Sequence, residues 1–141
     1  MSDEPDFHGA KVAVFIDDQI LVYRRDNKAD IPFPDMLDLP GGGREPGESG
    51  AECAARETFE EFGISIAMDA FELVQTYPNW RGTGHVALFF VCHLSSDILN
   101  DIVFGDEGQD WQVMPVAEFL ASDRAVPHLQ YQLQEYLKIW V

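Results

Sequence analysis

Short stretches rich in apolar residues alternate with polar turns along this chain, a pattern typical of β-strands joined by tight connections. The expected strands lie at residues 11–16, 20–24, 37–39, 71–77, 85–93 and 111–114. Polar residues 17–19 separate the first pair and predict a hairpin. Residues 86–91 are apolar on both faces, which is typical of a strand inside a sheet rather than at its edge.

Other segments carry helical signals, at residues 49–62, 115–121 and 127–140. The first is the best delimited. Ser49 and Glu52 have the spacing of a capping box at a helix start, and Gly63 is the residue type that most often ends a helix. The order of elements predicts an α/β fold in which a mixed sheet lies between helices.

The first predicted helix has two unlike faces. One side carries a stripe that we expect to pack on the sheet, formed by Ala51, Ala55, Phe59 and Phe62. The opposite side carries Glu57, Glu60 and Glu61. Acids at this spacing repel one another, by roughly 3 kcal/mol per close pair at an effective dielectric near 20. Protonation, exposure to bulk water, a salt bridge to Arg56 or a bound hard cation such as Mg²⁺ or Mn²⁺ would each relieve that repulsion.

The glycine run Gly41, Gly42 and Gly43 precedes this helix. We expect it to form a loop, because glycine permits positive φ and lets the backbone approach a ligand closely. Neither a strand nor a stable helix is expected there.

Together the glycines, Glu48 and the helix resemble the Nudix box, G-x5-E-x7-R-E-U-x-E-E-x-G-U, where U is a bulky apolar residue. The match begins at Gly42 and ends at Ile64, with every fixed position present. Thr58 is the one departure, because it stands at the first U position. The resemblance implies a Nudix-type α/β/α sandwich and a MutT-like pyrophosphohydrolase that needs a divalent metal, Mg²⁺ or Mn²⁺.

The resemblance also implies roles for individual residues. Glu60 and Glu61 match the principal metal ligands, and Glu57 matches a position that binds metal or acts as general base. The carbonyl of Gly41 matches a further ligand. Arg56 and Glu48 match a pair that orients the catalytic carboxylates and joins the loop to the helix.

The family often takes one more acid from a distant loop. Glu107 is our first choice for that metal-binding and catalytic role, within a Glu-Gly-Gln segment like that of MutT-type members, and Asp106 and Asp110 are the alternatives. An acidic surface turn without function is the other interpretation.

Candidates for substrate binding lie outside the box. Arg24, Arg25 and Arg44 are candidates for phosphate contact, or else ordinary surface cations. Trp80 beside Arg81 suits stacking on a base, although Trp80 also suits covering a sheet edge.

The small size of the chain and its Glu-Gly-Gln segment favour a nucleoside triphosphate or a related nucleotide as substrate. Alternatives are an ADP-ribose or nucleotide-sugar pyrophosphatase, which Pro78 supports weakly, and a nucleotide-sensing module without turnover. An isomerase on the same fold is disfavoured, because no catalytic Cys/Glu pair is evident.

The composition of the chain restricts its possible binding partners and its location. With 25 acidic and 9 basic residues the net charge is −16, which argues against binding nucleic acid polymers. No apolar run is long enough to span a membrane. Neither Cys53 nor Cys92 suggests a disulfide framework, and the acidic N-terminus lacks signal-peptide features, so we expect a cytoplasmic protein.

The 141 residues suit a single domain, with residues 1–6 expected to form a flexible N-terminus. Many members of the family are dimers, but no segment here displays an interface, so a homodimer stays open.

Overall fold

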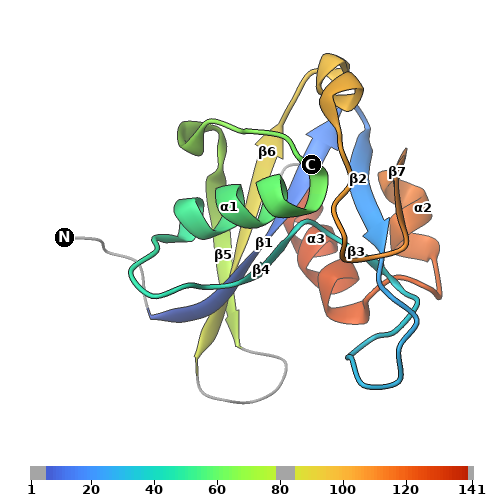
Figure 1. Cartoon of the computed structure of the whole chain (residues 1–141), viewed down its shortest axis with the longest axis horizontal. Coiled ribbons are helices and arrows are strands. Elements are labelled where there is room, and N and C mark those ends of the chain that lie inside the picture. The colour runs from blue at the N-terminus through green and yellow to red at the C-terminus, as the bar shows by residue number, and fades with distance from the viewer. Residues whose placement is uncertain (1–5, 79–84, 140–141) are drawn as a thin grey trace.

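The computed structural model describes residues 6–78 and 85–139, and its elements follow the order expected from the sequence except for β4 and two short 3-10 helices (Figure 1). The strands are β1 (Phe7–Ile16), β2 (Gln19–Arg24), β3 (Leu37–Asp38), β4 (Gly41–Gly43), β5 (Glu72–Pro78), β6 (Val86–His93) and β7 (Asp110–Pro115). The helices are α1 (Gly50–Phe62), α2 (Val116–Ala121) and α3 (Pro127–Ile139), with short 3-10 helices η1 (Met68–Ala70) and η2 (Ser96–Asp101).

The described strands form a 7-stranded mixed sheet with the order β3-β2-β1-β6-β5, in which β4 pairs with β1 and β7 pairs with β2. β1 runs parallel to β6, and the other pairs are antiparallel. β1 changes partner along its length: residues 9–11 pair with β4, whereas residues 15–16 pair with β2. The sheet therefore divides beside β1, between β4 and β2.

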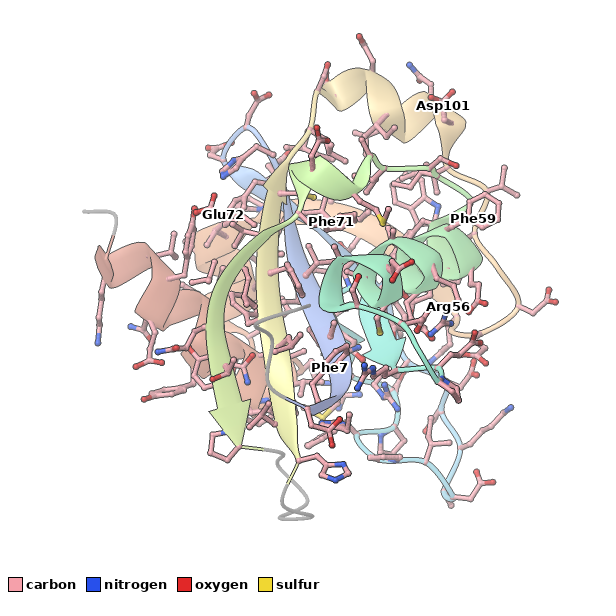
Figure 2. The ribbon with its side chains drawn as sticks, turned by 90° about the vertical axis from the view of Figure 1, so that its left-hand side faces the viewer. Phe7, Arg56, Phe59, Phe71, Glu72 and Asp101 are labelled. Atoms are coloured by element: carbon pink, nitrogen blue, oxygen red, sulfur yellow. The ribbon has the colours of Figure 1, made fainter. Side chains whose placement is uncertain are left out.

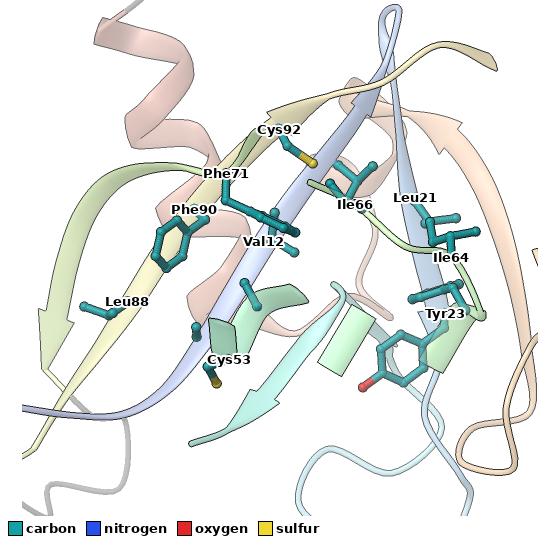
Figure 3. Close-up of a cluster of buried hydrophobic side chains, with 14 of the residues drawn as sticks. Val12, Leu21, Tyr23, Cys53, Ile64, Ile66, Phe71, Leu88, Phe90 and Cys92 are labelled. Atoms are coloured by element: carbon teal, nitrogen blue, oxygen red, sulfur yellow. The ribbon is translucent and has the colours of Figure 1, made fainter. Parts of the chain in front are cut away.

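Side chains of the central strands alternate between two cores, as the period of two in a strand requires. On β1, Val12 and Val14 belong to the core beneath α1, and Ala13 and Phe15 belong to the core beneath α2 and α3. Figure 1 shows α1 on one face of the sheet and α3 on the other, and Figure 3 shows Val12 gathered with its neighbours in the first core. The expected α/β/α sandwich with its mixed sheet is confirmed.

The expectation of an unstructured glycine loop was wrong. Gly41–Gly43 is a strand, antiparallel to β1. A Cβ at Gly41 would lie 2.1 Å from the Ala10 carbonyl oxygen, and its φ is +127°. Only glycine lets these two backbones pair so closely. β1 begins at Phe7 and not at the predicted residue 11, because it pairs with β6 from Phe7 and with β4 from Gly9.

The predicted sheet-facing stripe of α1 was partly wrong. Phe62 is fully buried, but Phe59 is 54% exposed. The helix turns instead toward the sheet with Cys53, Ala54, Thr58, Glu61 and Phe62. Thr58, the residue that departs from the motif, is buried at no cost in hydrogen bonding, because its hydroxyl donates to the Ala54 carbonyl at 2.7 Å.

The other helix signals are confirmed. Ser49 and Glu52 form the capping box, and Gly63 ends α1 with φ 70°. Cys53 and Cys92 are buried free thiols. Within the described ranges no helix is both long and apolar enough to cross a bilayer. Most of the expected flexible N-terminus, residues 1–5, lies outside the described residues.

Candidate active site

Two of the three helix glutamates reach one pocket. The pocket has a volume of about 530 Å³, and both Glu57 and Glu61 line it. Glu61 is 7% exposed. Glu60 is not among the lining residues, and its side chain is 54% exposed. The period of the helix explains this, because positions 57 and 61 are one turn apart whereas position 60 is rotated outward.

Arg56 connects the loop and the helix. Its guanidinium donates to both carboxylate oxygens of Glu48, at 2.6 and 3.0 Å, and to the Gly43 carbonyl at 2.8 Å. It also donates to Glu57 at 2.8 Å and Glu60 at 3.0 Å. The hydrogen bonds from Arg56 lower the pKa of Glu48. The predicted Arg56–Glu48 pair is thus present, with bidentate geometry. Figure 2 shows Arg56 on the edge of α1 nearest β4.

Glu61 is a buried acid with few partners. Burial raises its pKa to about 8, although the charge of Lys11 and the Gly41 N–H, which donates at 2.9 Å, oppose that shift. Burial also raises the pKa of Glu57, against the hydrogen bond from Arg56. Both carboxylates are therefore poised to gain from a cation that enters the pocket.

Gly42 leaves room for Glu57. A Cβ at position 42 would lie 2.5 Å from a Glu57 carboxylate oxygen, so any side chain here would displace that carboxylate. Gly43, the next residue, has open space, with its nearest neighbouring atom 4.0 Å away. The glycine run therefore serves the close approach of strand and helix.

Glu107 lines the same pocket as Glu57 and Glu61, from the segment before β7. The alternatives Asp106 and Asp110 are not among the lining residues. The segment is fixed to β2, because the Gln109 N–H donates to the Arg24 carbonyl at 2.8 Å. Three sequence-predicted acids thus face one cavity from two distant parts of the chain.

Of the arginines predicted to contact phosphate, one lines the pocket and two do not. Arg25 lines the pocket and pairs with Asp38 at 2.8 Å. Arg24 points to Asp35 instead, at 3.5 Å. Arg44 donates to the Glu48 carbonyl and lies over the Phe7 ring, outside the pocket lining. Trp80 and Arg81 lie outside the described residues.

Sequence reasoning missed a buried ionic cluster in the same pocket. Asp38 is 2% exposed and pairs with Lys11 at 3.0 Å as well as with Arg25. The Tyr23 hydroxyl donates to it at 3.1 Å. Burial pushes the pKa of Asp38 upward, but Lys11 and Arg25 overcome this and hold it below its usual value. A lone Lys11 in an apolar strand, and Asp38 between two leucines, are the signals that pointed to it.

The chemical type of the oxygen ligands in the pocket suits a hard cation. Glu57, Glu61, Glu107 and the Gly41 carbonyl are all oxygen donors, the ligands that Mg²⁺ and Mn²⁺ prefer. Across residues 6–78 and 85–139 no three acids, histidines or cysteines are close enough together to hold a metal ion, and Arg56 lies between Glu57 and Glu60. The Lys11 ammonium donates to the Gly41 carbonyl at 3.2 Å.

Comparison with known proteins identifies a family and a sequence relative. A model of the NUDIX domain matches residues 6–136. A putative 8-oxo-dGTP diphosphatase from Bacillus subtilis (strain 168) is 42% identical over 72 residues, which cover 51% of this chain and 43% of that protein. The aligned part is thus less than half the length of that relative.

The fold recurs in solved structures. A MutT protein from Methanosarcina mazei Go1 has a TM-score of 0.77 at 18% identity and covers 98% of this chain and 97% of its own. A bifunctional NMN adenylyltransferase/ADP ribose pyrophosphatase from Francisella tularensis, complexed with AMP and a Mn ion, has a TM-score of 0.68 at 21% identity. That match covers 97% of this chain and 43% of the other. At these identities the likeness concerns the fold.

Proposed function

Because the chain belongs to the NUDIX domain family, we propose that it is a divalent-metal-dependent hydrolase that cleaves the diphosphate linkage of a nucleotide. The observation that carries this proposal is the convergence of Glu57, Glu61 and Glu107 on one pocket. Our first candidate substrate is a nucleoside triphosphate or a related nucleotide. The 42% identity with a putative 8-oxo-dGTP diphosphatase supports that choice.

In this proposal Glu57, Glu61, Glu107 and the Gly41 carbonyl hold the metal, and Glu60 joins them when Arg56 releases it. A bound Mg²⁺ or Mn²⁺ would neutralise the bridging phosphates and acidify a bound water. Glu57 has two alternative roles: it either holds the metal or, as general base, takes the proton of that water. Arg56 and Glu48 hold the glutamates in position, since the arginine joins Glu48, Glu57 and Glu60 in one network.

The acidic surface and an anionic substrate are compatible in this arrangement. The chain carries a net charge of −16, but Lys11 and Arg25 line the pocket. They share one buried counter-charge, Asp38, so this part of the pocket is locally cationic. A phosphate is therefore attracted to this part of the pocket, and a bound metal would offset the charge of the glutamates beside it.

The test is a phosphate-release screen of nucleoside triphosphates, dinucleotides and nucleotide sugars with Mg²⁺ and with Mn²⁺. We expect Glu57→Gln, Glu60→Gln and Glu61→Gln each to lower kcat by ~100-fold or more with the fold retained. Glu118→Gln, at an exposed position on α2, is the matched control. Full activity in these variants, or in excess chelator, would refute the proposal.

An ADP-ribose or nucleotide-sugar pyrophosphatase is the second candidate, supported by the fold shared with the ADP ribose pyrophosphatase from Francisella tularensis. The same screen separates the two by product: nucleoside monophosphate plus pyrophosphate, or nucleoside monophosphate plus a sugar phosphate. Tight nucleotide binding without turnover across the whole panel would favour a sensing module. We place the protein in the cytoplasm as part of this proposal.

A further inference from the structure

A second group of residues lines the same pocket from the opposite layer of the sandwich. Val126, His128, Leu129 and Gln132 come from the start of α3 and the residue before it, and Phe33 comes from the loop between β2 and β3. Val126 and Leu129 belong to the core on the α3 face of the sheet, whereas α1 packs on the other face. The pocket therefore continues from the glutamates of α1 to the wall that α3 provides.

Gln132 is the unexplained member of this group. It is 7% exposed and lines the pocket, yet its carboxamide makes no hydrogen bond with any residue in the described ranges. Gln130, on the same helix, shows the usual solution: its amide donates to the carbonyls of Phe119, Leu120 and Ser122, at 2.9, 3.3 and 2.7 Å. Neither polar atom of the Gln132 carboxamide is fully buried, so the amide is open to the pocket and is suited to pair with a ligand there.

Aromatic and aliphatic side chains line the same pocket as this amide. The rings of Phe33 and His128 lie 5.5 Å apart at an interplanar angle of 54°. Burial lowers the pKa of His128, which favours the uncharged form of its ring. Val126 and Leu129 complete an apolar surface of the kind on which a planar ring packs.

The backbone at Phe33 is held in a costly conformation. Its φ is +50°, a region that a bulky residue rarely adopts. The neighbouring Pro32 carbonyl accepts a hydrogen bond from the Arg25 side chain at 2.9 Å, which fixes the loop over the pocket. Strain of this kind is commonly kept where a side chain has a functional place.

We propose that Gln132 reads the C6 position of a purine base in the substrate. This inference rests on the proposed function, because it takes the pocket to hold a nucleotide. A carboxamide offers one donor and one acceptor side by side. Adenine presents the complementary pair at its 6-amino group and adjacent ring nitrogen, and guanine presents it at O6 and N1–H. The Gln132 carboxamide can pair with either base, because a rotation of the amide group exchanges its oxygen and its nitrogen.

A purine fits the walls better than a pyrimidine does. The pocket has a volume of about 530 Å³, and its wall includes Phe33, His128, Val126 and Leu129. The larger bicyclic ring buries more apolar surface against these side chains, and burial of apolar surface increases affinity in proportion to area.

The test is calorimetric binding of monophosphates to the full chain in Mg²⁺, which needs no turnover. The ligands are adenosine, guanosine, uridine and cytidine monophosphates, ribose 5-phosphate, and purine riboside monophosphate, which lacks any group at C6. We expect adenosine or guanosine monophosphate to bind ~10- to 100-fold more tightly than purine riboside monophosphate, the range of a bidentate amide–base contact. In Gln132→Leu that difference should shrink to about 3-fold or less, with purine riboside monophosphate almost unaffected.

Gln134→Leu, at an exposed position on the same helix, is the matched control and should keep the full difference. Gln132→Met fills a similar volume without a hydrogen-bonding end, and it serves if the leucine variant does not fold. Equal losses for purine riboside monophosphate and ribose 5-phosphate would mean a structural role and would overturn the inference. Pyrimidine monophosphates binding as tightly as purine ones, or no binding of any monophosphate, would also overturn it.

The two hypotheses fail differently. Monophosphate binding with the expected C6 preference but no hydrolysis in the screen would overturn the proposed function alone. Hydrolysis of nucleotides with a C6 preference that Gln132→Leu leaves unchanged would overturn the role of Gln132 alone.

Discussion

At the scale of single residues, two buried acids of the pocket behave in opposite ways. Asp38 forms salt bridges with Lys11 at 3.0 Å and with Arg25 at 2.8 Å, and its pKa is lowered. Glu61 receives one short hydrogen bond, from the Gly41 N–H at 2.9 Å, and burial raises its pKa to about 8. The same functional group is therefore a satisfied structural element at position 38 and a group that lacks a full counter-charge at position 61.

Glu61 should make the stability of the metal-free protein depend on pH. Its folded-state pKa is about 8, whereas a glutamate in an unfolded chain titrates near ~4.3. Between these values the folded chain binds more protons than the unfolded chain. The free energy of unfolding therefore falls as the pH rises, by at most about 1.4 kcal/mol per pH unit. Glu57, whose pKa is also raised, adds to this slope, and His128, whose pKa is lowered, opposes it. Acids with lowered pKa values, such as Asp38 and Glu48, act at more acidic pH.

Urea unfolding of chelated protein from about pH 5 to about pH 8 measures this slope. Glu61→Gln should flatten it, and Glu118→Gln, at an exposed position, should not. Mg²⁺ should restore stability at the alkaline end of the range, because a cation favours the ionised carboxylate. A slope in Glu61→Gln equal to that of the wild type would show that another group is responsible.

At the scale of elements, β4 and α1 form one unit. Gly41–Gly43 pairs with β1, and the capped helix follows. Arg56 then closes the unit by donating to the Gly43 carbonyl at 2.8 Å and to Glu48 at 2.6 Å. Positions 41 and 42 must be glycine, because the backbone of β1 lies against the first and the Glu57 carboxylate against the second. This unit sets the position of the glutamates relative to the sheet.

Adjacent glycines provide a matched pair to test that unit. Gly42→Ala places a methyl group 2.5 Å from a Glu57 oxygen, so the side chain of Glu57 has to move. Because that side chain is flexible, we expect the Tm to change little, while kcat falls ~10-fold or more through misplacement of the carboxylate. Gly43→Ala, with its nearest atom at 4.0 Å, should leave both quantities close to wild type. Equal kcat values in the two variants would contradict a catalytic position for Glu57.

At the scale of the whole molecule, Asp35 joins three segments that surround the pocket. Its carboxylate accepts from Gln109 at 2.8 Å and from Arg124 at 2.7 Å, and it lies 3.5 Å from Arg24. These contacts connect the loop that carries Phe33, the segment that carries Glu107 and the connection between α2 and α3. The two predicted parts of the site, for metal and for base, thus share one anchor.

Removal of that anchor should loosen the pocket without unfolding the protein. Asp35 has a φ of 61°, which alanine tolerates less well than aspartate or asparagine. For Asp35→Ala we expect faster amide hydrogen exchange in residues 26–36 and 106–109 and a lower kcat/KM. Asp35→Asn, which keeps an acceptor oxygen, should lie between that variant and wild type. Asp30→Ala, in the same loop and exposed, is the control. Unchanged exchange in Asp35→Ala would contradict a coupling role.

Local signals in the sequence were enough to predict most elements. The capping box at Ser49 and the terminal Gly63 delimit α1 correctly, because capping depends on residues within one helical turn. The strands and the closing helix were likewise predicted within a few residues of their observed bounds. The exposed Phe59 and the strand at Gly41–Gly43 were not predictable from such signals, since both depend on how closely α1 and β1 approach.

The sequence by itself determined the order of elements, the helix caps and the set of candidate acids, because each depends on spacing along a short segment. Only the tertiary structure decided that Glu61 is buried while Glu60 is exposed, and that Lys11 lies against Gly41 and Asp38. It alone placed Gln132 in the pocket of the glutamates. The physical reason is that burial and charge pairing arise between segments far apart in the chain, whose approach is set by the packing of both layers on the sheet.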